Sequence, residues 1–168
     1  DRGSDVPVMT SLFNDVKGEV LGLSHESKIY RLSCADGRIT CELKDSISSL
    51  LEKEEVNSVC IDRKGRLWLN TTLGRILRSD ETMHKFENVS LDNEIDDCTV
   101  LGLLSDKNSV WIITNKKVLQ YNIDSQTFQH YSTADDNIMV DVFRYKAISL
   151  DGWGGLYVGC LLYTSPSP

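Results

Sequence analysis

Residues 62–71 read Asp-Arg-Lys-Gly-Arg-Leu-Trp-Leu-Asn-Thr, and this stretch recurs along the chain. Residues 15–24 match it without gaps 47 positions earlier, and residues 151–159 match it 89 positions later. A looser copy, residues 105–114, has Asn108 in place of the glycine. The four copies are therefore 47, 43 and 46 residues apart, a period that favours either a β-propeller blade or a repeat of two or three helices.

The apolar pattern inside each copy indicates strands. A short apolar run precedes each acidic turn, and a run rich in β-branched and aromatic residues follows it, such as Leu67-Trp68-Leu69. Two further short runs alternate apolar and polar residues with a period of two, and all four are too short for helices. The sequence therefore predicts an all-β fold, a β-propeller fragment of about three and a half four-stranded antiparallel blades with a repeat of 43–47 residues.

The expected blades cover residues of about 8–43, 56–89 and 98–132, and a fourth begins at 143–159. Residues 1–7 are expected to be a disordered or non-native leader. Residues 160–168 are expected to be a non-native tail, because Cys-Leu-Leu-Tyr-Thr-Ser-Pro-Ser-Pro resembles a translated sequencing adapter. Since propellers close with roughly four to eight blades, we expect a longer parent protein.

Residues 45–55 connect the first two expected blades. Ile47, Leu50 and Leu51 share one face of a helix that Asp45 could cap. A short helix and an ordered loop are equally compatible with this segment.

The Asp-x-x-Gly turn of each repeat has a physical reason. The aspartate can accept hydrogen bonds from backbone N–H groups just after it, and the glycine tolerates a positive φ. The aromatic residue that follows is expected to pack between neighbouring blades, and the threonine after it to form an inter-strand hydrogen bond. These structural repeat positions are Asp15, Gly18, Leu21, Asp62, Gly65, Trp68, Thr71, Trp111, Thr114, Asp151, Gly154 and Tyr157.

Residues 56–78, VNSVCIDRKGRLWLNTTLGRILR, resemble the two-component regulator propeller repeat, as do LSDKNSVWIIT at 104–114 and YNIDSQTFQHY at 121–131. The resemblance extends over residues 8–159, and the Trp-Asp and Gly-His marks of WD40 repeats are absent. Departures from the pattern are Leu21 in place of an aromatic residue, Ser27 in place of the glycine found at Gly74, and Asn108.

In that family the repeats build the periplasmic sensor half of hybrid histidine kinases, typical of Bacteroides-type bacteria that sense carbohydrates. The resemblance implies a periplasmic, ligand-sensing input region with an oligosaccharide ligand and no catalysis or cofactor of its own. Its implied partners are the remaining propeller blades and the downstream signalling domains of the parent protein, for which the resemblance implies a homodimer. A stand-alone propeller that serves as a protein-interaction scaffold stays open as the alternative.

Composition argues against several other partners. The chain has 18 Lys and Arg against 25 Asp and Glu, a net charge of −7 and a pI of about 4.9. Without a dense basic run, neither a nucleic acid nor an anionic membrane surface is an expected partner. No apolar run is long enough to predict a transmembrane helix.

No catalytic, cofactor or metal site is predicted. The histidines His25, His84 and His130 have no catalytic or metal-ligand spacing and are expected on the surface. A propeller enzyme would need carboxylates or a metal at the axial channel. The expected inward positions are instead apolar: Leu12, Val59, Leu101 and Ile148.

Two acidic runs lack the glycine of a calcium loop and are expected to be solvated. They comprise Asp92, Glu94, Asp96, Asp97, and then Asp135, Asp136, Asp141. The five cysteines form no CxxC pair, and Cys60 is expected in the core. Cys34 and Cys41 flank a predicted tight turn, and a disulfide between them stays open.

Overall fold

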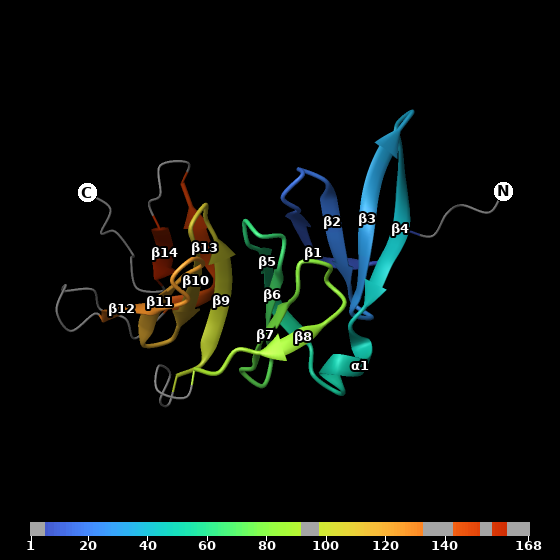
Figure 1. The fold of residues 1–168 in the computed structure, drawn as a ribbon. Helices are drawn as coiled ribbons and strands as arrows, with labels where there is room; N and C mark the ends of the chain where they lie inside the picture. Colours follow the sequence, from blue (N-terminus) through green and yellow to red (C-terminus); the bar gives the residue numbers. More distant parts are fainter. Residues whose placement is uncertain (1–5, 92–97, 133–142, 152–155, 161–168) are drawn as a thin grey trace, which may run out of the picture. The chain divides into compact units, whose positions relative to one another are not determined.

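The computed structural model describes residues 6–91, 98–132, 143–151 and 156–160 (Figure 1). It divides into two units, Asp1–Asn88 and Val89–Pro168, each of which is described by itself. The predicted all-β class and the four-stranded antiparallel sheets are confirmed. In each sheet the strands pair in the order in which they follow along the chain, as in a propeller blade.

The first unit contains two complete sheets joined by one helical turn. The first sheet, blade 1, consists of β1 (Met9–Asn14), β2 (Val20–Ser24), β3 (Lys28–Ala35) and β4 (Arg38–Ser46). The helix α1 spans Ser48–Leu51. The second sheet, blade 2, consists of β5 (Val56–Ile61), β6 (Leu67–Thr71), β7 (Ile76–Ser79) and β8 (Phe86–Asn88).

The second unit contains a third sheet and a two-stranded one. The third sheet consists of β9 (Val100–Ser105), β10 (Ser109–Thr114), β11 (Lys117–Asn122) and β12 (Phe128–Ser132). The strands β13 (Phe143–Leu150) and β14 (Leu156–Cys160) pair antiparallel with one another. The first strands of these two sheets, β9 and β13, lie side by side, which is the arrangement of successive propeller blades.

The core of the first unit lies between blades 1 and 2, whose first strands β1 and β5 are neighbours. Blade 1 contributes Leu21, Leu23 and Ile29, and blade 2 contributes Leu67 and Leu69, all buried. Full burial of such a side chain stabilises the fold by about 1.5–3 kcal/mol, so this interface holds the two blades together.

The connection between the blades corrects one expectation. The helix begins only at Ser48, no side chain caps it, and Asp45 still belongs to β4. Ile47 and Leu51 are buried in the inter-blade core, but Leu50 is 38% exposed. Ile47 precedes the helical turn, with a φ of −101° and a ψ of 6°, so regular helical spacing does not relate it to Leu50, which does not share the buried face.

The first strands of the blades place two of the expected inward positions differently. Val59 packs against the inter-blade core, whereas Leu12 is 65% exposed. Side chains alternate between the two broad faces of a sheet, and in a propeller those faces meet neighbouring blades. Leu101 is partly buried, and the side chain of Ile148 lies outside the described residues.

The cysteines at the β3–β4 turn do not form a bridge. Cys34 is opposite Ile39 and Cys41 is opposite Leu32, and both thiols are free. The register therefore places the two cysteines diagonally rather than opposite one another. Cys60 is buried, as expected.

Candidate functional site

The carboxylate of Asp62 makes two separate sets of contacts. Its Oδ1 accepts backbone N–H bonds from Lys64 at 2.9 Å and Arg66 at 3.1 Å, which closes the turn between β5 and β6. Its Oδ2 accepts the indole N–H of Trp68 and the guanidinium Nε–H of Arg66, each at 2.8 Å. Asp62 is 1% exposed and Trp68 is fully buried, so the aspartate joins the turn to the next strand inside the protein.

The second unit repeats this arrangement. Asp106 Oδ1 accepts the backbone N–H of Asn108 and Ser109, and Oδ2 accepts the Trp111 indole N–H at 2.8 Å. The hydroxyl of Tyr157 donates to Asp151 Oδ2 at 3.2 Å. Gly154 lies outside the described residues.

Sequence reasoning missed both this bond and the role of Asp106. The available signal was the constant spacing of five or six residues between each aspartate and the aromatic residue that follows it.

Blade 1 keeps the turn but loses the second set of contacts. Asp15 Oδ1 accepts the backbone N–H of Lys17 and Glu19, each at 2.8 Å, and Gly18 has a φ of 80° against 79° at Gly65. Leu21 stands where blade 2 has its tryptophan, and Glu19 stands where blade 2 has its arginine. Neither residue can donate to Asp15 Oδ2, which has no hydrogen-bond partner among the described residues.

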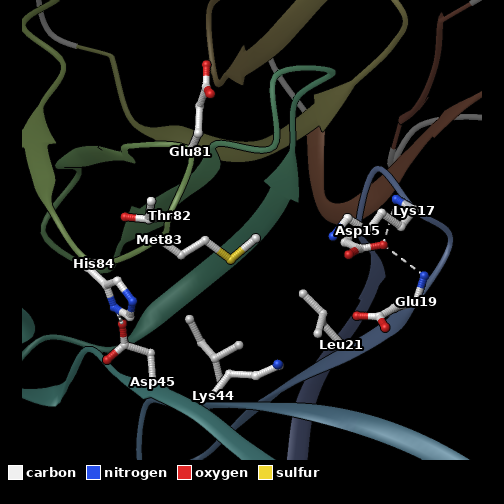
Figure 2. A pocket seen from close by; sticks show the side chains of 11 residues that line it. Asp15, Lys17, Glu19, Leu21, Lys44, Asp45, Glu81, Thr82, Met83 and His84 are labelled. Carbon is white, nitrogen blue, oxygen red and sulfur yellow. Dashed lines mark hydrogen bonds and ion pairs between the residues drawn. The ribbon is translucent and has the colours of Figure 1, made fainter.

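Asp15 lies at the edge of a cleft of about 380 Å³ within the first unit (Figure 2). Blade 1 supplies residues from its first turn and its outer strands, and blade 2 supplies its β7–β8 turn. Leu21 and Met83 point toward one another across the cleft. The complete lining is Asp15, Lys17, Glu19, Leu21, Ile29, Lys44, Asp45, Glu81, Thr82, Met83 and His84.

Charged groups surround an apolar floor in this cleft. His84 Nδ1 lies 2.8 Å from Asp45 Oδ2 and so links the two blades, although the histidine side chain is 68% exposed. Glu19 pairs with Arg31 at 3.2 Å. The Lys17 and Lys44 ammonium groups form no hydrogen bond or ion pair in the described part of the chain, so they are available to a ligand.

The β7–β8 turn that carries His84 is held by Asp80. Its Oδ1 accepts the Thr82 hydroxyl at 2.9 Å and the backbone N–H of His84 at 3.1 Å. Burial raises the pKa of Asp80, but these bonds and one from the Lys85 backbone outweigh it, so that the pKa falls below its usual range. The charged carboxylate therefore fixes the loop that forms one wall of the cleft.

The repeat threonines close the hairpin that follows the aromatic residue. Thr71 Oγ1 accepts the Arg75 backbone N–H at 3.2 Å, and Thr114 Oγ1 accepts that of Lys117 at 2.9 Å. Arg75 also pairs with Glu54, and this contact lowers the pKa of the Glu54 carboxyl.

The remaining predicted positions add no site. His25 and His130 are exposed. The acidic residues at 92–97 and 135–141 lie outside the described residues. Across 6–91, 98–132, 143–151 and 156–160, no group of three or more His, Cys, Asp or Glu is placed to hold a metal ion. The same residues contain no helix of sufficient length and hydropathy to span a membrane.

Neither a family model nor a curated protein matches the chain, but solved structures do. The extracellular domain of the hybrid two component system BT3049 from B. thetaiotaomicron is 23% identical, with a TM-score of 0.55 over 93% of this chain and 20% of that one. The extracellular domain of BT4673 from the same organism is 17% identical, with a TM-score of 0.61 over 95% of this chain and 23% of that one.

A different protein, YCF48 bound to D1 peptide, is 22% identical, with a TM-score of 0.58. That match covers 84% of this chain and 45% of YCF48, so the chain spans less than half of each neighbour's length. The sheet topology and these likenesses together show that the chain has a β-propeller fold, and its structural neighbours include extracellular domains of B. thetaiotaomicron hybrid two-component systems, the class to which its repeats pointed.

Proposed function

We propose that this chain belongs to the ligand-sensing input region of a two-component regulator. The observation that carries the proposal is the divergence of blade 1 beside the cleft. Asp15 keeps its turn, but the two residues that would occupy its second oxygen are replaced by Leu21 and Glu19. A repeat with a purely structural role has no need to leave a carboxylate oxygen open to a cleft, whereas a binding site does.

The ligand class that suits the cleft is an oligosaccharide. Its volume of about 380 Å³ lies in the range of small-molecule sites. The Lys17 and Lys44 ammonium groups can donate to sugar hydroxyls, and Asp15 can accept from them. Met83 offers apolar surface to the C–H face of a sugar ring. No aromatic side chain is among the described residues that line the cleft.

In this proposal the region lies in the periplasm and has no catalysis of its own. Its partners are further propeller blades and the downstream signalling domains of a homodimeric parent protein. A ligand acts by favouring one arrangement of blades 1 and 2 over another, because only a difference in affinity between two states shifts their populations. The His84–Asp45 contact between the blades is one that such a shift would alter.

Calorimetric titration with a panel of neutral and acidic oligosaccharides tests the proposal. We expect saturable binding to the wild-type chain that Asp15→Asn or Lys44→Met weakens about tenfold or more, a loss of about 1.4 kcal/mol. Lys64→Met is the matched control, since Lys64 occupies the same turn position in blade 2 as Lys17 in blade 1. Absence of saturable binding, or equal weakening by the control, would contradict the proposal.

A protein-interaction scaffold is the second candidate. It is favoured by the likeness to YCF48, a protein solved with a bound peptide. A protein partner that binds the wild-type and the Asp15→Asn chain equally well, in the absence of any saccharide response, would favour the scaffold over the sensor.

A further inference from the structure

The fourth strand of blade 1, β4 (Arg38–Ser46), forms an edge that no other described strand covers. It is the last strand of its sheet, and most of its residues are exposed (Figure 1). The corresponding strands of the second and third sheets are shorter, Phe86–Asn88 and Phe128–Ser132. The unpaired N–H and C=O groups of a long edge strand are a template for pairing with a strand of another chain.

The β3–β4 turn determines which backbone groups point outward. Asp36 and Gly37 both have a positive φ, 52° and 71°, as in the two-residue turns that join antiparallel strands. Ala35 and Arg38 close this turn as the first hydrogen-bonded pair of the two strands. Because hydrogen-bonded pairs alternate along antiparallel strands, every second residue of β4 from Ile39 onward points its backbone groups to the open edge.

Charged side chains form a row of alternating sign on one face of blade 1. Glu19 lies 3.2 Å from Arg31 on β3, and Arg31 Nε donates to Glu42 Oε2 at 3.0 Å. Glu42 ends this row at the open edge, with 59% of its side chain exposed. Arg38 lies on the same face of β4, four positions away, and is exposed. It has no ion pair in the described part of the chain.

We propose that the β4 edge binds the β4 edge of a second copy of this chain, antiparallel and about a two-fold axis at Thr40. This register places Arg38 of each copy opposite Glu42 of the other, so the row of alternating charge continues across the contact. It also places Ile39 opposite Cys41, whose backbone groups both point outward and can exchange N–H···O=C bonds. A two-fold axis brings the same surface of both copies together.

Charge favours this register over the two that would overlap more of the strand. An axis at Cys41 would set Arg38 opposite Lys44, and an axis at Glu42 would set that carboxylate opposite itself. Like charges directly opposite one another in a sheet are destabilising. The pairing is independent of the cleft and its ligand, and it goes beyond the proposed homodimer by assigning the surface that joins the two copies.

Cysteine cross-linking tests the contact and its register. Residue 40 of the two copies forms a non-hydrogen-bonded pair on the axis, with Cα atoms about 4.5 Å apart, which suits a disulfide. The chain carries Thr40→Cys, and the cysteines other than the buried Cys60 are replaced by serine. Ser33→Cys in the same background is the matched control, because Ser33 is exposed and opposite Thr40 but lies one strand away from the edge. Under mild oxidation we expect residue 40 to link two chains about tenfold or more faster than residue 33.

Charge substitutions test the row at the contact. Arg38→Glu sets carboxylates opposite one another at both ends of the pairing, so cross-linking through residue 40 should slow by about tenfold. Mixing this chain with a Glu42→Arg chain, both with Thr40→Cys, should restore the rate, since every opposed pair then has opposite signs. Lys64→Glu makes the same change in net charge at an exposed position of blade 2 and should leave the rate unchanged. Circular dichroism verifies that each variant is folded.

Sedimentation velocity measures the pairing without a cross-link. We expect a weak dimer of the wild-type chain, whose fraction rises with concentration and falls in Arg38→Glu. A wild-type chain that stays monomeric at millimolar concentration would overturn the proposal. Equal cross-linking at residues 33 and 40 would also overturn it, as would faster cross-linking through the native Cys41, which marks the register with its axis there. Saccharide binding by a chain that does not pair would refute the β4 contact and leave the sensing function standing.

Discussion

The indole N–H of Trp68 donates a hydrogen bond to Oδ2 of Asp62 across 2.8 Å, and both side chains are buried. Trp68→Phe removes the donor and leaves that oxygen with the Arg66 guanidinium alone. Because a buried acceptor that loses a partner is costly, we expect the free energy of unfolding in urea to fall by about 1–3 kcal/mol. The bond from Trp111 to Asp106 is only part-buried, so Trp111→Phe should lower the free energy of unfolding by less. An equal cost at both positions would contradict the argument.

Asp15 and Asp62 should respond differently to the same substitution. An asparagine keeps Oδ1 as the acceptor that closes the turn but replaces Oδ2 with an amide that cannot accept. In Asp62→Asn the new amide faces the N–H donors of Trp68 and Arg66 and cannot accept from them. We therefore expect the free energy of unfolding to fall by about 1–3 kcal/mol. In Asp15→Asn the new amide faces no such donor, so the free energy of unfolding should change by no more than about 0.5 kcal/mol. Thermal unfolding of both variants under the same conditions tests this difference in stability.

Ser27 has a φ of 58°, in the left-handed region, at the turn position where blade 2 has Gly74 with a φ of 83°. A residue with a Cβ pays about 1–2 kcal/mol for this conformation, and the greater entropy of glycine in the unfolded chain offsets part of that. Ser27→Gly should therefore stabilise the protein by about 0.5–1 kcal/mol, and Gly74→Ser should destabilise it. Urea unfolding midpoints of the two variants give the sign of each change in stability. A lower midpoint for Ser27→Gly than for the wild type would show that Ser27 is not strained.

Glu54 should contribute to the pH dependence of stability. Arg75 lies 2.5 Å from Glu54 Oε1, and its hydrogen bond lowers the pKa of the carboxyl below its ordinary value of 4.5. A group with a lowered folded-state pKa stabilises the fold above its unfolded pKa, and that contribution is lost as the pH falls through the folded value. The unfolding free energy of the wild type should thus exceed that of Glu54→Gln at neutral pH, and the difference should shrink below pH 4.5.

Glu26→Gln is the control for this pH series. Its pKa is also lowered, by Lys28, but this pair is exposed to solvent, where ion pairs contribute little. A difference between wild type and Glu54→Gln that stays constant from neutral pH to well below pH 4.5 would show that Arg75 does not stabilise the charged form.

The blades could be predicted from the sequence because their signals are local. An Asp-x-x-Gly turn needs only four residues to specify its geometry, and strands of four to six residues with alternating polarity leave no room for helices. Repetition strengthens the prediction of strands, because the same turn and strand pattern occurs at residues 15–24, 62–71 and 151–159.

The cleft could not be predicted, because its residues come from separate parts of the chain. Asp45 and His84 are 39 positions apart and meet only after blades 1 and 2 pack. Leu21 was visible as a departure from the repeat, but its consequence for Asp15 depends on the aspartate–aromatic bond of the other blades. The diagonal placement of Cys34 and Cys41 likewise depends on the register of β3 and β4, which spacing alone leaves open.

The bonds of Asp62, Asp106 and Asp151 also bear on how the chain folds. Each joins a turn to a residue no more than six positions away, so it can form within a single hairpin before any neighbouring blade exists. Local contacts cost little chain entropy, and proteins rich in them fold quickly. A growing polypeptide could thus order its hairpins one after another as they emerge. The hairpin of blade 1 lacks this bond, so it depends on the Asp15 turn and on packing against blade 2 to become rigid.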